Sequence, residues 1–80
     1  MKRIIDAEVN NITGKRIKEA RIKAGLSQNI LSVRLETMAV YVCRGSVSRI
    51  ENGARTVTDI EIDAISKVLN VSLDELFGRG

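Results

Sequence analysis

Apolar residues recur along most of this chain at intervals of three or four, the spacing of a helix with one buried face. Together with the residue types that begin and end helices, this spacing predicts five helices, over about residues 12–24, 27–38, 43–52, 58–69 and 72–78. Only the stretch from Ile4 to Val9 alternates at the two-residue period of a strand, and it does so weakly. The pattern therefore predicts an all-α fold.

Four of the predicted helices start in the same way: a capping residue follows one apolar residue and precedes a second that packs back on the first. These sets are Leu26, Ser27 and Leu31; Val42, Cys43 and Val47; Val57, Thr58 and Ile62; and Val71, Ser72 and Leu76. Glu61 completes a capping box with Thr58. A thiol is a poorer cap than a hydroxyl, so we expect the helix start at Cys43 to be weaker by up to about 1 kcal/mol. The left-handed residues that end helices are predicted to be Gly25, Gly53 and Asn70.

The buried faces of these helices are predicted to be aliphatic, because Tyr41 and Phe77 are the only aromatic residues. The inward residues are predicted to be Ile17, Ala20 and Ala24; Leu31, Leu35 and Met38; Cys43, Val47 and Ile50; Ile62, Ile65, Val68 and Leu69; and Leu73, Leu76 and Phe77.

The third predicted helix has an outer face that is small, polar and basic. At about 100° per residue it gathers Gly45, Ser48, Arg49 and Asn52, with Arg44 at the start. Two short helices with a tight connection, the second with a polar outer face, are typical of a helix-turn-helix. A major groove about 12 Å wide admits one helix, and an arginine fork suits guanine O6 and N7. The alternative from the residues alone is an amphipathic surface helix with two solvated arginines.

Length and charge limit the other possibilities. Eighty residues form one small domain with a net charge of +3. Residues 1–55 carry eleven Lys and Arg against five Asp and Glu, whereas residues 56–80 carry two against five. This asymmetry favours a polyanion as partner on one side and a different partner on the other.

The cysteine count and the hydropathy exclude further classes. A single cysteine and no histidine leave no internal disulfide and no metal-ligand cluster, which fits a reducing cytoplasm. No apolar run approaches the roughly 18 residues of a membrane span. We therefore expect a cytoplasmic protein without a metal, a cofactor or a membrane segment.

Three stretches resemble the Cro/CI-type (XRE-like) helix-turn-helix domains of phage and bacterial repressors. They are "GKRIKEARIKAGLSQ", "SVSRIENGAR" and "VLNVSLDELFG", and the resemblance covers residues 11–78. It implies a compact five-helix bundle of the lambda-repressor-like type that binds double-stranded DNA, usually as a dimer on a paired operator. It also implies base contacts from Arg44, Gly45, Ser48 and Arg49, and DNA-backbone contacts from Gln28, Asn52 and Arg55.

This chain departs from the family pattern before the third helix. Family members often pass from the residue matching Leu35 through one glycine to the residue matching Val42, whereas this chain has "ETMAVY" in between. Because Met38 continues the apolar stripe, we expect an extra turn on the second helix and then a lengthened elbow in the helix-turn-helix. Ser32 replaces the usual alanine, and its hydroxyl is expected to bond back to its own helix.

Arg21 and Glu51 are predicted to form an internal ion pair. Arg21 lies about 40° around its helix from Ile17, and Glu51 lies about 40° from Val47, so both flank the stripes by which these helices pack. The family resemblance points to the same pair. Glu51 is then structural, and breaking the pair would cost about 3–5 kcal/mol if the remaining charge is fully desolvated.

The two ends of the chain offer further contacts. Residues 1–10 are predicted to form an N-terminal arm and residues 11–80 the DNA-binding domain. The arm suits a frayed terminus, a minor-groove contact by Lys2 and Arg3, or an intermolecular strand formed by Ile4, Ile5 and Val9. The candidate surface for a second copy or another protein consists of Ile22, Leu73 and Phe77.

These observations favour a sequence-specific DNA-binding transcriptional regulator, expected to be a repressor that binds a palindromic operator as a homodimer. The residues that would add salt-dependent attraction are Lys15, Lys18, Lys23 and Arg34. The alternative on the same fold is an antitoxin or other protein-interaction module that uses Ile22 and the C-terminal helix. An enzyme is not expected, because the chain has no histidine, no nucleophile–base pair and no phosphate-binding glycine loop. Cys43 suits either redox sensing beside DNA or a half-buried filling role.

Overall fold

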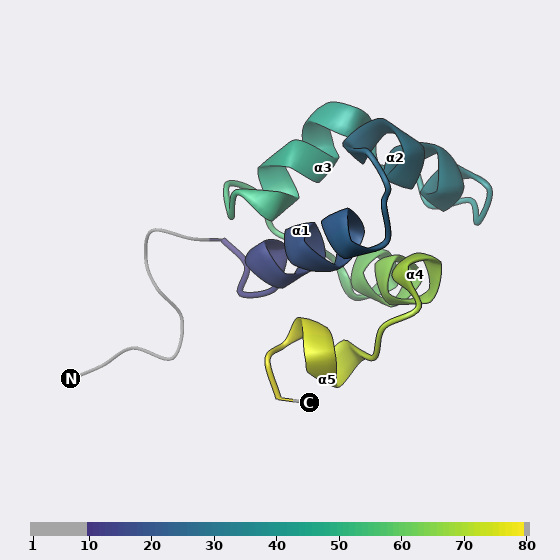
Figure 1. The fold of residues 1–80 in the computed structure, drawn as a ribbon. Helices are drawn as coiled ribbons and strands as arrows, with labels where there is room; N and C mark the ends of the chain where they lie inside the picture. The colour runs from purple at the N-terminus through teal and green to yellow at the C-terminus, as the bar shows by residue number, and fades with distance from the viewer. Residues whose placement is uncertain (1–9, 80) are drawn as a thin grey trace.

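The computed structural model describes residues 10–79, which form five helices and no strand (Figure 1). The helices are α1 (Gly14–Lys23), α2 (Gln28–Glu36), α3 (Arg44–Glu51), α4 (Asp59–Leu69) and α5 (Leu73–Leu76). Each corresponds to one predicted helix, so the all-α prediction is confirmed. The predictions made for Lys2, Arg3, Ile4, Ile5 and Val9 lie outside the described residues.

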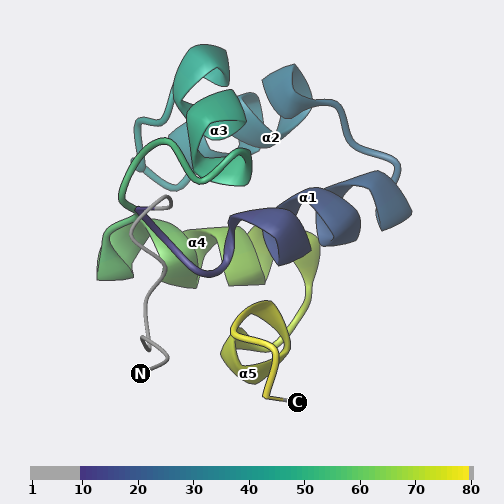
Figure 2. The same cartoon turned by 90° about the vertical axis from the view of Figure 1, so that its left-hand side faces the viewer.

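Helix α1 lies at the centre of the bundle. The two perpendicular views show α2 and α3 on one side of it, α5 on the opposite side and α4 alongside it (Figure 1, Figure 2). Helix α1 packs against α3, α4 and α5, and α2 packs against α3 and α4. The pair α2 and α3 therefore forms one end of the domain, and α5 forms the other.

The core is aliphatic, as the composition predicted. Its buried apolar residues are Ile17, Leu31, Leu35, Val42, Val47, Ile50, Ile62, Ala64, Ile65, Leu69 and Leu76. Three others that were expected inside, Ala20, Val68 and Phe77, are partly buried against this cluster. The helical spacing therefore identified most of the core correctly.

Four residues predicted to point inward are exposed instead, namely Ala24, Met38, Cys43 and Leu73. Ala24 is the C-cap of α1 and Cys43 is the N-cap of α3, so neither continues the helical path. Met38 follows the end of α2, and Leu73 opens the four-residue α5; each keeps 40% of its surface exposed. The predictions for Ala24, Met38 and Cys43 were wrong because helical spacing places side chains reliably only within a helix. Leu73 lies within α5, but it is the first residue of this short helix and remains exposed.

Helix α2 ends at Glu36, so the extra turn expected on it is wrong. The amide of Ala39 donates to the Glu36 carbonyl at 2.9 Å, and the amide of Val40 donates to the Leu35 carbonyl at 3.0 Å. With Ala39 in the left-handed region at a φ of 61°, these bonds form a Schellman ending that turns the chain away from the helix axis. Residues 37–43 then connect α2 to α3 as the lengthened elbow that was predicted.

The predicted helix starts and ends are confirmed at most positions. The caps Ser27, Thr58 and Ser72 each accept a hydrogen bond from the backbone amide three residues later. The capping box of Thr58 and Glu61 is present. The predicted left-handed residues Gly25, Gly53 and Asn70 all have positive φ. Cys43 makes no side-chain cap bond to the backbone, as expected for a thiol.

The start of α1 is held by Asn11, which the sequence analysis did not identify. The Asn11 Oδ1 accepts hydrogen bonds from the amides of Thr13 at 3.1 Å and Gly14 at 2.7 Å. The Asn11 Nδ2 donates to the carbonyls of Ile50 at 3.0 Å and Arg55 at 2.8 Å. One side chain therefore satisfies the first amides of α1 and joins them to the end of α3.

The same junction explains why α1 begins with glycine. Gly14 is buried, and a Cβ there would overlap the backbone carbonyl oxygen of Ile50. Because the obstacle is backbone, a side-chain rotation cannot relieve it. By contrast, a Cβ on Gly45 in α3 would have nothing within 4 Å.

We expect Gly14→Ala to lower the free energy of unfolding by about 2–3 kcal/mol or more, because overpacking a close junction forces the backbone to move. The matched change Gly45→Ala should raise it by about 0.5–1 kcal/mol, because alanine favours a helix interior over glycine. Urea unfolding measures both. Equal free energies for the two variants would show that α1 and α3 do not meet closely at Gly14.

Candidate nucleic-acid interface

Helix α3 has one face in the core and the other open. Val47 and Ile50 are 2% and 1% exposed and pack into the core. The residues that the resemblance assigned to base contacts lie away from this buried face: Arg44, Gly45 and Arg49 are exposed, and Ser48 is half-buried. Asn52, the C-cap of the helix, is exposed as well. The structure therefore places the four residues predicted to contact bases on α3, with Asn52 at its C-terminal end.

The orientation of α3 is set by the predicted ion pair, which is present. Arg21 Nε donates to Glu51 Oε2 at 2.7 Å, and Arg21 Nη2 donates to Glu51 Oε1 at 3.1 Å. The two side chains are 10% and 1% exposed. Arg21 Nη1 also donates to the Leu26 carbonyl at 2.8 Å, ahead of α2. A buried, two-pronged pair of this kind fixes α1, the start of α2 and α3 relative to one another.

Gln28, the first residue of α2, belongs to the same network. Its Nε2 donates to Glu51 Oε1 at 3.1 Å, a contact that the sequence analysis missed. An amide nitrogen carries two hydrogens, so one remains for another acceptor. Glu51 therefore holds in place the side-chain amide of Gln28, which the resemblance assigned to a phosphate contact.

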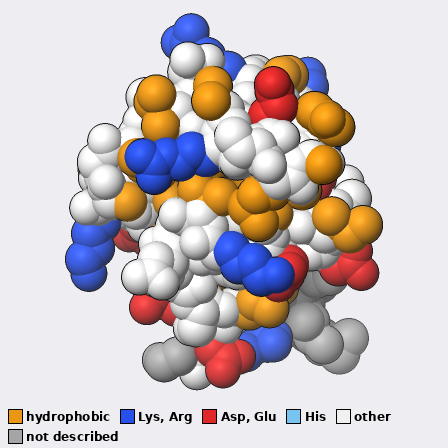
Figure 3. Space-filling view, turned by 90° about the vertical axis from the view of Figure 1, so that its right-hand side faces the viewer, with side chains coloured by type: hydrophobic (Ala, Val, Ile, Leu, Met, Phe, Trp, Pro, Cys, Tyr) orange, Lys and Arg blue, Asp and Glu red, His pale blue; other side chains and the backbone are white. Residues whose placement is uncertain are grey.

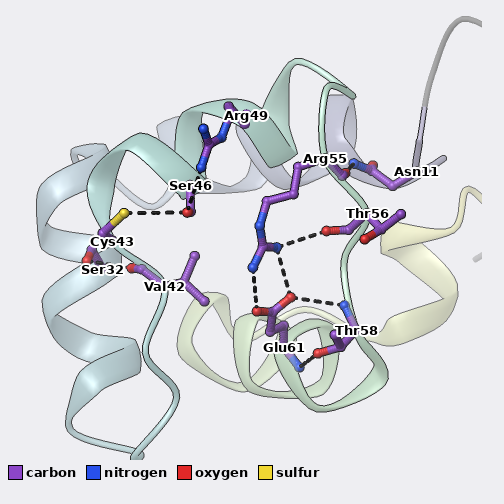
Figure 4. A network of polar contacts seen from close by, with 10 residues as sticks. All are labelled: Asn11, Ser32, Val42, Cys43, Ser46, Arg49, Arg55, Thr56, Thr58 and Glu61. Atoms are coloured by element: carbon purple, nitrogen blue, oxygen red, sulfur yellow. Dashed lines mark hydrogen bonds and ion pairs between the residues drawn. The ribbon is translucent and has the colours of Figure 1, made fainter.

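Arg55, also assigned to the DNA backbone by the resemblance, is paired with α4 (Figure 4). Its Nη1 and Nη2 donate to the two carboxylate oxygens of Glu61 at 3.0 and 2.8 Å, and Nη1 also donates to the Thr56 carbonyl at 2.8 Å. The hydrogen bonds from Arg55 lower the pKa of the Glu61 carboxyl, although burial opposes this shift. Glu61 also accepts from the Thr58 amide at 3.0 Å. The carboxylate therefore ties the segment after α3 to the start of α4.

Cys43 stands exposed at the start of α3. Its sulfur lies 3.4 Å from the Ser46 hydroxyl (Figure 4), and hydrogen bonding with that hydroxyl lowers the pKa of the thiol. The half-buried filling role considered for this residue is therefore not observed.

The hydroxyl of Ser32 bonds across the helix-turn-helix and not to its own helix. Ser32 Oγ donates to the Val42 carbonyl at 2.6 Å, so the expectation of a bond back to α2 is wrong. The acceptor in the elbow is ten residues away in sequence, and helix periodicity does not indicate that it comes within reach.

The rest of the surface carries both basic and apolar side chains. The basic residues expected to attract DNA from a distance, Lys15, Lys18, Lys23 and Arg34, are all exposed. Figure 3 shows hydrophobic side chains across the middle of one face, with Lys and Arg side chains above, beside and below them. Ile22 and Leu73, two of the three residues considered for a protein contact, are 59% and 40% exposed.

A family model described as Helix-turn-helix matches residues 17–76, which include nearly all of the five helices. Comparisons with curated proteins and with solved structures find no significant match. None of the described helices is both long enough and apolar enough to cross a membrane. Residues 10–79 also contain no group of three His, Cys, Asp or Glu that could hold a metal ion.

We expect Glu51→Ala to lower the free energy of unfolding by about 3–5 kcal/mol, because Arg21 would remain buried without a counter-charge. The double variant Arg21→Met/Glu51→Leu should recover much of this loss, because it buries no charge. Glu19→Ala, at an exposed site on α1, is the control and should change stability by less than about 0.5 kcal/mol. Urea unfolding of the four proteins measures these differences, and a Glu51→Ala protein as stable as wild type would contradict the expectation.

The Arg55–Glu61 pair should make stability depend on pH. Since the folded pKa of Glu61 lies below its ordinary value of 4.5, the stabilisation is present above that value and is lost as the pH falls through the lowered pKa. Glu61→Gln should therefore destabilise the protein at pH 7 and much less in strong acid. Asp63→Asn, which breaks the exposed pair with Lys67, serves as the control and should have little effect at either pH. Urea unfolding at the two pH values tests this, and a pH-independent effect of Glu61→Gln would refute it.

Proposed function

This chain belongs to the Cro/CI-type helix-turn-helix family of DNA-binding regulators, and we propose that it represses transcription by binding a palindromic operator as a homodimer. In this proposal α3 is the recognition helix and lies in the major groove of double-stranded DNA. The repressor acts in the cytoplasm and blocks polymerase by occupying the operator.

The observation that carries the proposal is the open face of α3 with Gly45 in its first turn. A glycine inside a helix costs about 0.5–1 kcal/mol relative to alanine. The described part of the chain gives no reason for this cost, because the space beside Gly45 is empty to 4 Å. A glycine at this place lets the helix backbone approach a partner closely, as required at the base edges.

Four side chains of α3 and its surroundings carry the proposed recognition. Arg44 and Arg49 are exposed cations that can each engage guanine O6 and N7. Ser48 is the small polar neighbour that hydrogen-bonds a base or a bound water. Asn52, at the C-cap, contacts the DNA backbone.

Two further backbone contacts come from residues that carboxylates hold in place. Gln28 is bonded to Glu51 and uses its second amide hydrogen for a phosphate. Arg55 has both terminal nitrogens on Glu61, so in this proposal its contact with the DNA backbone is made beside that pair. Long-range attraction from the exposed lysines makes affinity fall as salt rises.

A dimer places two copies of α3 one helical turn of DNA apart, about 34 Å. The candidate contact surface is formed by the exposed Ile22 and Leu73 together with Phe77. The same exposed surface supports the second candidate function, an antitoxin or other protein-interaction module that binds its partner through α5.

Binding-site selection from random duplexes at moderate salt tests the proposal. We expect the wild type to enrich a symmetric motif, and Arg44→Ala to lose information at one position in each half-site, because one bidentate contact contributes about 1–3 kcal/mol of discrimination. Gly45→Ala should bind the selected duplex at least about tenfold more weakly despite its greater stability, because a methyl group intrudes between helix and groove. Lys67→Ala is the charge-matched control, since Lys67 is exposed on α4 and pairs with Asp63 of the same helix. It should leave the motif unchanged.

Two outcomes would overturn the proposal. If the wild type enriches no motif above background, the protein-interaction module becomes the better-supported function. If Arg44→Ala keeps the full motif, α3 does not read the bases through this residue.

A further inference from the structure

The two ends of the elbow, residues 37–43, are held in different ways. The Schellman ending at Ala39 fixes the end that leaves α2. At the other end the Val42 side chain is 3% exposed in the core, and the Val42 carbonyl accepts the hydrogen bond from Ser32 Oγ (Figure 4). Within residues 10–79 the backbone of Val42 makes no other hydrogen bond.

This bond acts directly on the start of α3. The carbonyl of Val42 and the amide of Cys43 belong to one planar peptide unit. Fixing the oxygen therefore fixes the plane from which the chain continues into Arg44, the first residue of the helix. The side-chain burial of Val42 locates this point, and the hydrogen bond orients it.

Helix α3 needs such an external constraint more than the other helices do. The starts of α2, α4 and α5 each have a hydroxyl cap, and the first amides of α1 bond to Asn11. Cys43 provides no cap bond to the backbone of α3. The first turn of α3 is therefore the least constrained by its own residues, although it carries Arg44 and Gly45.

We propose that Ser32 is a positioning residue for the DNA-reading face: its hydroxyl sets the direction in which α3 leaves the elbow. It acts through the Val42–Cys43 peptide and touches no DNA itself. The effect on DNA rests on the proposed function, whereas the effect on α3 rests on the intramolecular geometry alone.

The test compares Ser32→Ala with Ser66→Ala in the full chain. Ser66 Oγ donates to the Asp63 carbonyl at 2.7 Å, so the control removes a similar hydroxyl–carbonyl bond, but one that lies within α4. Hydrogen exchange is read at two equivalent amides, Val47 in α3 and Ile62 in α4, each bonded at 2.9 Å to the carbonyl of its N-cap residue. Because a change in global stability affects both exchange rates, taking their ratio cancels its effect.

We expect Ser32→Ala to raise the Val47-to-Ile62 exchange ratio about fivefold, the effect of one lost hydrogen bond. Affinity for the duplex selected by the wild type should fall about fivefold, because a smaller fraction of molecules holds α3 in the binding orientation. Ser66→Ala should not raise the ratio or lower the affinity. Ser32→Ala/Cys43→Ser should restore both, because a hydroxyl cap then constrains the same turn.

An unchanged exchange ratio in Ser32→Ala would overturn the inference. So would a raised ratio with undiminished affinity, which would make the bond merely structural. If no duplex can be selected, the proposed function fails while the exchange ratio still decides whether Ser32 constrains α3.

Discussion

The helix-turn-helix of this protein is held in one arrangement by the buried carboxylate of Glu51. Its two oxygens accept hydrogen bonds from Arg21 and Gln28, and Arg21 also bonds to the Leu26 carbonyl. Three segments therefore converge on one anion. Rotating α3 about its axis would separate Glu51 from Arg21 and leave charges buried without partners, which is costly. Apolar packing brings α3 onto the core, and this ion pair fixes which of its faces points outward.

The two ends of α3 are fixed by polar contacts from other elements. At its end, the Asn11 side chain bonds to the Ile50 carbonyl, and the absence of a side chain at Gly14 lets α1 approach. At its start, Ser32 bonds to the Val42 carbonyl. On the outer face, Arg49 Nη2 donates to Ser46 Oγ at 3.4 Å, a contact within α3 itself. The small and basic residues of this face therefore suit a partner more than the packing of the fold.

Residues at the margin of the proposed interface serve both fold and binding. Gln28 and Arg55 are each bonded to a carboxylate, Glu51 and Glu61, that is largely removed from solvent. Side chains held in this way lose less conformational entropy when they bind a partner. The same bonds also contribute to the stability of the fold. When Gln28 or Arg55 is substituted, a loss of DNA binding therefore has to be distinguished from a loss of folding.

The sequence by itself determined the five helices, most of their caps and most of the core, because helical spacing and capping are local. It also indicated the Arg21–Glu51 pair, since both residues flank the apolar stripes of helices that must pack. It did not indicate that α2 ends as early as Glu36, because the left-handed residue that follows is Ala39 and alanine is not a typical left-handed residue. Only the tertiary structure decided the contacts of Asn11 and Ser32: their acceptors are backbone carbonyls, which every residue carries and which no sequence pattern distinguishes.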